Sequence, residues 1–97
     1  MMLVVVAYDV NTESQDGRRR LRRVAHVCEN YGQRVQKSVF ECLVDATQWT
    51  VLKAALVSEI EEAEDSLRFY FLGDNWKGRV QQVGLDGSYD PQGPLIV

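Results

Sequence analysis

The feature that most constrains the fold is the valine-rich run Met2–Tyr8, which contains no charged side chain. A half-exposed strand alternates apolar and polar residues, whereas an uninterrupted apolar run of this length is typical of a strand buried on both faces. Such a strand lies in the middle of a sheet. Asp9 therefore stands at the end of a predicted central strand, and a polar loop follows as far as Gly17.

The same run is too short to cross a bilayer, which needs about 20 apolar residues. It also lacks the basic leader and the cleavage site of a signal peptide, so we expect a cytoplasmic protein without a membrane partner. The 97 residues suit a single domain. Cys28 and Cys42 are the only cysteines and form no CxxC motif, which favours reduced core residues.

Two further elements follow in the first half of the chain. Apolar residues at helical spacing predict a helix from Arg18 to Tyr31, with Gly32 as its stop. The segment Arg34–Val44 is rich in β-branched and aromatic residues but is too long for one average strand. We interpret it as two short strands with a bend near Lys37 and Ser38.

The second half begins with Asp45–Gln48, which resembles a capping box. The helix predicted behind it has one apolar face, formed by Trp49, Leu52, Leu56 and Ile60. The acidic stretch Glu61–Asp65 is typical of a solvated helix end. Ser66–Leu72 predicts a fourth strand, and Gly78–Val83 is a candidate for a short fifth strand.

The resulting order, βαββαβ plus an extra strand, predicts an α+β fold of the ferredoxin-like type, with both helices on one face of an antiparallel sheet. The domain would span residues 1–83, and residues 84–97 would form an irregular tail rich in Gly and Pro. Both sides of the strand Ser66–Leu72 are apolar. Because the helices cover only one face, we expect a homodimer packed sheet to sheet.

Charge is distributed unevenly along the chain. Residues 1–40 carry seven basic and four acidic groups, whereas residues 41–97 carry four basic and ten acidic groups. Five arginines lie within Arg18–Arg23, where they repel one another and oppose the helix macrodipole. A solvated helix face is one interpretation. The local cost favours the other, binding of nucleic-acid phosphates, with Arg34 and Lys37 extending the surface.

The inventory of reactive side chains is small. His26, the single histidine, falls on the polar side of the predicted helix, and no nucleophile–histidine couple or phosphate-binding motif is present. Asp74 lies in a Gly-Asp-Asn sequence typical of a turn. Asp9 is either a loop-opening residue or a ligand for a divalent metal, and a two-fold axis near it would bring two carboxylates together.

Several segments resemble one known family, the CRISPR-associated protein 2 family, over about residues 3–83. The similar segments are Tyr8-Asp9-Val10 at the strand end, the arginine-rich helix start, Tyr31-Gly32, the sequence RVQKSVFE at Arg34–Glu41, and the sequence LRFYFLG at Leu67–Gly73. The combination of Tyr-Gly with RVQKSVFE is the specific part of the resemblance.

This resemblance implies a ferredoxin-like homodimer in which Asp9 of both chains shares one metal ion, Mg²⁺ or Mn²⁺. Asp9 and Tyr8 would be the catalytic residues, and Phe40 would support the site. Arg20 is the best match for the family's helix-start arginine, and Arg34 matches a second-strand arginine. The nucleic-acid contacts are then expected at Arg18, Arg19, Arg20, Arg23 and Arg34.

Two functions follow from the resemblance together with the residues. The first is a metal-dependent endonuclease acting on RNA or DNA in CRISPR adaptive immunity, during spacer acquisition. The alternative is a non-catalytic DNA-binding scaffold that bridges CRISPR integrase dimers. A small-molecule-binding regulator of the same fold is disfavoured, because such domains rarely concentrate five arginines in six residues.

Overall fold

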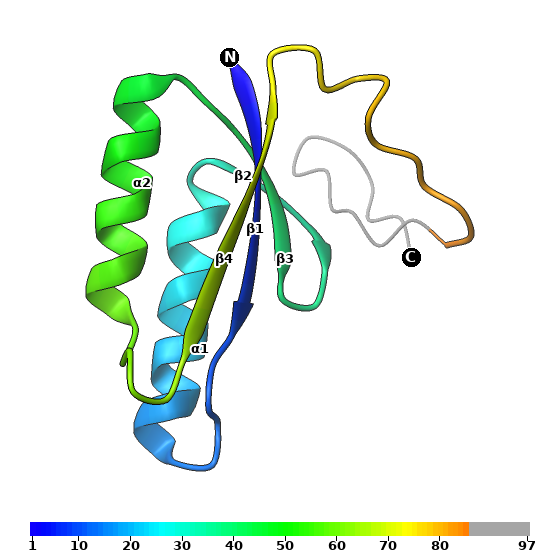
Figure 1. The fold of residues 1–97 in the computed structure, drawn as a ribbon. Coiled ribbons are helices and arrows are strands. Elements are labelled where there is room, and N and C mark those ends of the chain that lie inside the picture. The colour runs from blue at the N-terminus through cyan, green and yellow to red at the C-terminus, as the bar shows by residue number, and fades with distance from the viewer. Residues whose placement is uncertain (86–97) are drawn as a thin grey trace.

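The computed structural model of the chain describes residues 1–85 and shows one sheet with two helices (Figure 1). The elements alternate in the order predicted from the sequence. They are β1 (Met2–Asp9), α1 (Gln15–Glu29), β2 (Gly32–Gln36), β3 (Val39–Val44), α2 (Ala46–Glu59) and β4 (Ser66–Gly73). Neither helix in the described part of the chain is long and apolar enough to span a membrane.

The four strands are antiparallel in the spatial order β2-β3-β1-β4. β1 pairs with β3 on one side and with β4 on the other, which confirms the central position predicted from its apolar run. Both helices lie on the same face of the sheet (Figure 1). The α+β, ferredoxin-like prediction is therefore confirmed.

The core lies between the sheet and the helices. β1 contributes Val4 and Val6, which have no exposed surface. The other fully buried side chains come from α1, β3 and α2; they are Val24, Cys28, Phe40, Cys42, Val44, Leu52 and Leu56. The two cysteines are free thiols within this core, as expected.

Two local predictions are confirmed by hydrogen bonds. The Gln48 amide donates to Asp45 Oδ1 at 2.7 Å, and the Asp45 amide donates to Gln48 Oε1 at 2.9 Å. This reciprocal pair is the capping box at the start of α2. The predicted bend at Lys37 and Ser38 separates β2 from β3.

Helix α1 begins earlier than the arginine cluster suggested. Ser14 is its N-cap and accepts a hydrogen bond from the Gly17 amide at 3.0 Å, so the helix starts at Gln15 rather than at Arg18. The helix ends at Glu29 rather than at Tyr31. Only Arg18 falls in the first turn, so the macrodipole opposes the cluster less than the sequence implied.

The predicted fifth strand at Gly78–Val83 is wrong, since no strand follows β4 among the residues described as far as Leu85. This segment crosses the sheet face opposite the helices. Trp76 lines the same hollow as Leu3 and Leu43, which face away from α1 and α2. A strand needs a neighbour for its backbone hydrogen bonds, and a chain that crosses a sheet face has none. Most of the tail predicted at 84–97 lies outside the described residues.

Candidate metal and nucleic-acid site

Asp9 is the last residue of the central strand. Side chains alternate along a strand, so Asp9 shares a face with Val5 and Ala7, whereas Val4 and Val6 point into the core. We call the face opposite the helices the open face. The Asp9 carboxylate is exposed, and within residues 1–85 it makes no hydrogen bond or ion pair. It is therefore free to bind a ligand.

Tyr8 lies on the opposite face of β1 from Asp9. Its side chain is 6% exposed, and its ring stacks on Phe40 with 6.2 Å between centroids. The Arg34 guanidinium lies 5.2 Å from the Phe40 centroid. The Tyr8 hydroxyl is buried without a hydrogen-bond partner among the described residues. Burial raises the pKa of Tyr8, and the positive charge of Arg34 opposes that rise.

The structure thus joins Tyr8, Arg34 and Phe40 into one cluster on the helix side of the sheet. It does not join them to the Asp9 carboxylate, which faces the other way. The supporting role of Phe40 for the site stays a prediction. The predicted catalytic role of Tyr8 has no counterpart in a contact with Asp9.

Arg20 is set apart from the other arginines by an internal partner. Its Nε donates to Asp65 Oδ2 at 2.8 Å and its Nη2 to Asp65 Oδ1 at 3.2 Å. Its side chain is 17% exposed, and that of Asp65 is fully buried. A guanidinium that holds a carboxylate in this two-pronged geometry is not free to bind phosphate. We therefore leave Arg20 out of the proposed nucleic-acid surface.

The remaining arginines of α1 are exposed. Arg19 lies 3.8 Å from Asp16 and Arg23 lies 4.0 Å from Glu59, whereas Arg18 donates to the Thr12 carbonyl at 3.1 Å. Exposed ion pairs of this kind contribute little to stability, so these arginines can give up their carboxylate partners for other anions. We call Arg18, Arg19, Arg22 and Arg23 the helix arginines. His26 is 78% exposed beside Glu29, which confirms its predicted surface position.

The acidic stretch after α2 was interpreted as a solvated helix end. The structure ends α2 at Glu59 and places these residues in the turn that follows, so they are not a helix end. Glu61, Glu62 and Glu64 are exposed as expected, whereas Asp65 is buried. Asp65 precedes β4 directly, at a position where an alternating strand pattern begins. Composition could not separate it from its neighbours, because the arginine that binds it lies 45 residues earlier.

The buried pair predicts how stability depends on pH. The Arg20 guanidinium, helped by backbone amides, holds the pKa of Asp65 below its ordinary value of about 3.9. A carboxyl whose pKa is lower in the folded protein than in the unfolded chain stabilises the fold at pH values above its unfolded-state pKa. This contribution is lost as the pH falls through the folded-state pKa. We expect the free energy of unfolding to fall on acidification below about pH 4, and Asp65→Asn to flatten that fall.

Denaturant unfolding at a series of pH values measures this effect. Glu64→Gln is the matched control, since it removes an exposed carboxylate 3.4 Å from the same guanidinium. An unchanged pH dependence in Asp65→Asn would contradict the assignment.

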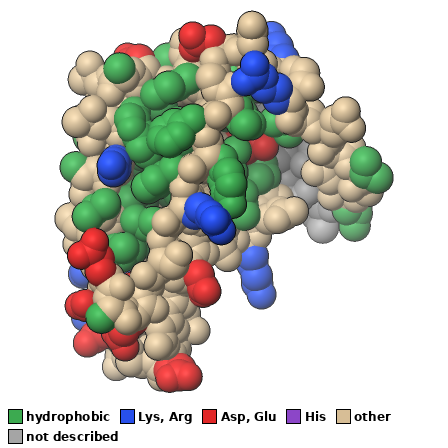
Figure 2. All heavy atoms as spheres, in the orientation of Figure 1, with side chains coloured by type: hydrophobic (Ala, Val, Ile, Leu, Met, Phe, Trp, Pro, Cys, Tyr) green, Lys and Arg blue, Asp and Glu red, His purple; other side chains and the backbone are tan. Residues whose placement is uncertain are grey.

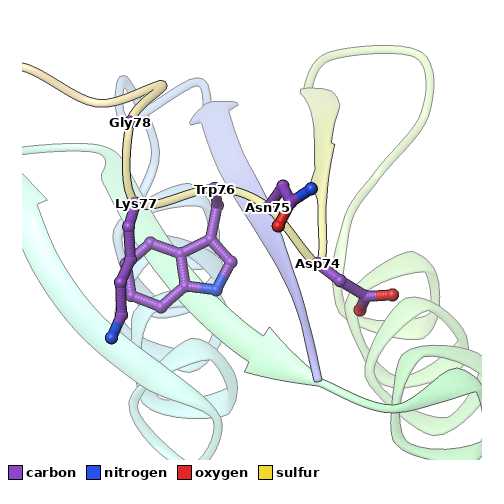
Figure 3. A pocket seen from close by; sticks show the side chains of 5 residues that line it. All are labelled: Asp74, Asn75, Trp76, Lys77 and Gly78. Atoms are coloured by element: carbon purple, nitrogen blue, oxygen red, sulfur yellow. The ribbon is translucent and has the colours of Figure 1, made fainter.

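The turn after β4 encloses a hollow lined by Asp74, Asn75, Trp76, Lys77 and Gly78. Figure 3 shows the side chains of Asp74 and Lys77 pointing in opposite directions from this turn. Gly73 adopts a φ of 73° there, so the prediction of a turn is confirmed. Residues 1–85 contain no group of three or more His, Cys, Asp or Glu that could hold a metal ion.

Hydrophobic side chains gather along β4 and the adjacent side of α2 (Figure 2). Phe71 is 56% exposed, and Trp49 packs edge-on against Phe69 and Phe71. On the open face, Tyr70 pairs with Val5 and is 48% exposed. The segment after β4 covers part of the open face near β2 and β3, where Val80, Gln81 and Gln82 line a hollow with Val35 and Val39.

The fold and the site define a small ferredoxin-like protein with a free carboxylate at the end of its central strand and an arginine-rich helix. Comparison with known proteins identifies the family within this class. The family model for CRISPR associated protein Cas2 matches residues 2–80, so the chain belongs to the Cas2 family.

Its relatives include the CRISPR-associated endoribonuclease Cas2 of Nitratidesulfovibrio vulgaris, 56% identical over 99% of this chain and 94% of the relative. The CRISPR-associated endonuclease Cas2 of Halalkalibacterium halodurans is 57% identical over 98% of this chain and 99% of the relative. The crystal structure of Streptococcus pyogenes Cas2 at pH 6.5 is similar with a TM-score of 0.76 at 54% identity, covering 86% of this chain and 100% of that one.

Proposed function

We propose that this protein is a metal-dependent endonuclease that cleaves RNA or DNA and acts in spacer acquisition by a CRISPR system. The names of its relatives support the nuclease class. The observation that carries the proposal is the Asp9 carboxylate, exposed and unpaired within the described residues, at the end of β1. A carboxylate left without a partner at a fixed strand end is available to a cation.

The donor set fits Mg²⁺ or Mn²⁺ best when two chains contribute. Mg²⁺ is typically bound by one or two carboxylates together with waters and substrate phosphate oxygens. One chain supplies Asp9 alone at this point. Since Asp9 lies on the open face, a dimer packed through that face with its two-fold axis near the end of β1 would place the two Asp9 residues opposite each other.

When bound, the ion would polarise the scissile phosphate and activate a water molecule. The chain's own contribution is positioning. Asp9 of each chain would hold the ion, and the helix arginines would bind flanking phosphates through their exposed guanidinium groups. With its hydroxyl enclosed, Tyr8 acts in this proposal by packing the strand end against Phe40 and Arg34 rather than on the substrate.

Removal of the metal tests the proposed function directly. We expect cleavage of single-stranded RNA or duplex DNA in Mg²⁺ or Mn²⁺, loss of cleavage in excess EDTA, and recovery when the metal is restored. The measurement is the rate of substrate loss on gels, with protein freed of contaminating nucleases. Cleavage that persists undiminished in EDTA would contradict the proposal.

The homodimer is a separate prediction. We expect a species of about twice the 11.1 kDa chain mass in sedimentation at low micromolar concentration. Tyr70→Glu would place charge on the open face within the proposed dimer interface, and burying it there should weaken the dimer about a hundredfold or more. Val51→Glu on α2, 53% exposed, is the control. A stable monomer would also remove the shared metal site.

The second candidate function is the non-catalytic scaffold, which binds duplex DNA and bridges CRISPR integrase dimers. The observation in its favour is that the site has only one carboxylate per chain. The two functions share the homodimer and the helix arginines. They differ in whether Asp9 is needed.

A further inference from the structure

The buried carboxylate of Asp65 joins three separate parts of the chain. Beyond the two bonds from Arg20, Oδ1 accepts from the Asn11 amide at 3.0 Å and Oδ2 from the Glu61 amide at 2.9 Å. Four donors thus meet two oxygens, from the β1–α1 loop, from α1 and from the turn after α2. An ionised carboxylate is tolerated in a buried place only when it is satisfied in this way.

These bonds lie next to Asp9, both along β1 and across the β1–β4 pair. In the register of β1 and β4, Asp9 is the partner of Ser66, the residue directly after Asp65. Asn11 follows Asp9 by two residues. The Asp65 carboxylate therefore ties the two chain segments together just beyond their last strand pair, to which Asp9 belongs.

A second contact fixes the same loop from the other side. A Cβ at Gly17 would lie 1.8 Å from the Asn11 carbonyl oxygen, so the loop packs directly on the first turn of α1. Asn11 Oδ1 also accepts from the Glu13 amide at 3.0 Å. The backbone after Asp9 is therefore held between Gly17 and Asp65.

A site with one ligand per chain depends strongly on such support. Mg²⁺ requires near-ideal octahedral geometry, and functional groups must be held within about 0.5 Å of their working positions. The Asp9 carboxylate itself makes no hydrogen bond or ion pair within the described residues that would orient it. Its position is set by the backbone on either side.

We propose that Asp65, held by Arg20, is the positioning residue for Asp9. The pair keeps the end of β1 in the place where the carboxylates of two chains can share one divalent ion. This inference rests on the proposed function, in which Asp9 is the metal ligand, and it gives Arg20 a role other than phosphate binding.

The test compares Asp65→Asn with Glu64→Gln in the full-length homodimer. We expect Asp65→Asn to weaken Mn²⁺ binding about 10- to 100-fold, the loss typical when a group that orients a metal ligand is removed. Cleavage should fall by a similar factor at limiting Mn²⁺ and recover partly at saturating Mn²⁺. Hydrogen exchange at the Asn11 amide, measured by NMR, should become faster. Glu64→Gln should leave all three readouts unchanged.

The outcomes separate a positioning role for Asp65 from a purely structural one. If Asp65→Asn lowers thermal stability but leaves Mn²⁺ affinity unchanged, the residue is merely structural and the inference is overturned. If Asp65→Asn does not fold, Arg20→Lys, which keeps the charge but loses the two-pronged geometry, carries the same comparison.

Failure of the proposed function would give a different set of results from failure of this inference. In that case the unsubstituted protein would bind no Mn²⁺ through Asp9, and Asp9→Ala would change nothing. Asn11 exchange would still report on positioning. Faster exchange in Asp65→Asn would support the tie itself, and unchanged exchange would overturn it.

Discussion

Replacing Asp9 with alanine is expected to lower the rate of metal-dependent cleavage by about a thousandfold or more. A metal ion contributes several kcal/mol to stabilising charge in the transition state, and each 1.4 kcal/mol is about tenfold in rate. In the proposed site both protein ligands are Asp9, so one substitution removes them together. Cleavage rates at saturating Mg²⁺ and Mn²⁺ measure the effect.

Glu13→Ala is the matched control, because it removes an exposed carboxylate from the neighbouring loop. Its side chain takes no part in the contacts that hold Asn11, so cleavage should stay within about twofold of the unsubstituted rate; a surface change of this kind shifts stability by no more than about 0.5 kcal/mol. Undiminished cleavage in Asp9→Ala would exclude Asp9 as the metal ligand.

The same variant separates the two candidate functions. Asp9→Ala should leave DNA affinity intact, since the helix arginines carry the phosphate contacts. If the variant also keeps its association with a CRISPR integrase, the scaffold role stands independently of cleavage. Loss of DNA binding together with cleavage would instead show that Asp9 is needed for the structure of the complex.

Substituting alanine for all four helix arginines is expected to have the second-largest effect. Each phosphate contact contributes about −0.9 to the slope of log affinity against log salt for duplex DNA. The dimer presents the set twice, so the slope should flatten by several units, and affinity at low salt should fall by orders of magnitude. The loss should be similar for all sequences, because backbone contacts carry no base information.

Salt titrations of binding to unrelated duplexes provide the measurement. Lys53→Ala on α2 is the control for loss of an exposed positive charge. Stability should change by no more than about 0.5 kcal/mol for each arginine replaced, because the arginines lie on the surface. An unchanged salt slope in the fourfold variant would mean that the cluster is a solvated helix face and that nucleic acid binds elsewhere.

The sequence alone determined those features whose physical cause is local. The apolar run Met2–Tyr8 was enough to place β1 in the middle of the sheet, and the spacing of Asp45 and Gln48 was enough to place the start of α2. In both cases the deciding interactions lie within a few residues. The position of Asp9 at the end of the central strand followed from the same pattern.

Two errors arose where the local signals were incomplete. Apolar spacing predicts the start of α1 at Arg18, because it contains no signal for the cap at Ser14, which is a single hydroxyl. The local pattern makes Gly78–Val83 a candidate strand, although a strand also needs a partner along its edge.

Only the tertiary structure decided which charged residues belong together. Five arginines look alike in sequence, as do the acidic residues of Glu61–Asp65. Packing of α1 against the turn after α2 brings Arg20 to Asp65 and leaves the other arginines exposed. The free energy of a buried ion pair depends on the burial of both partners and on their geometry, and the chain sets these only when it folds.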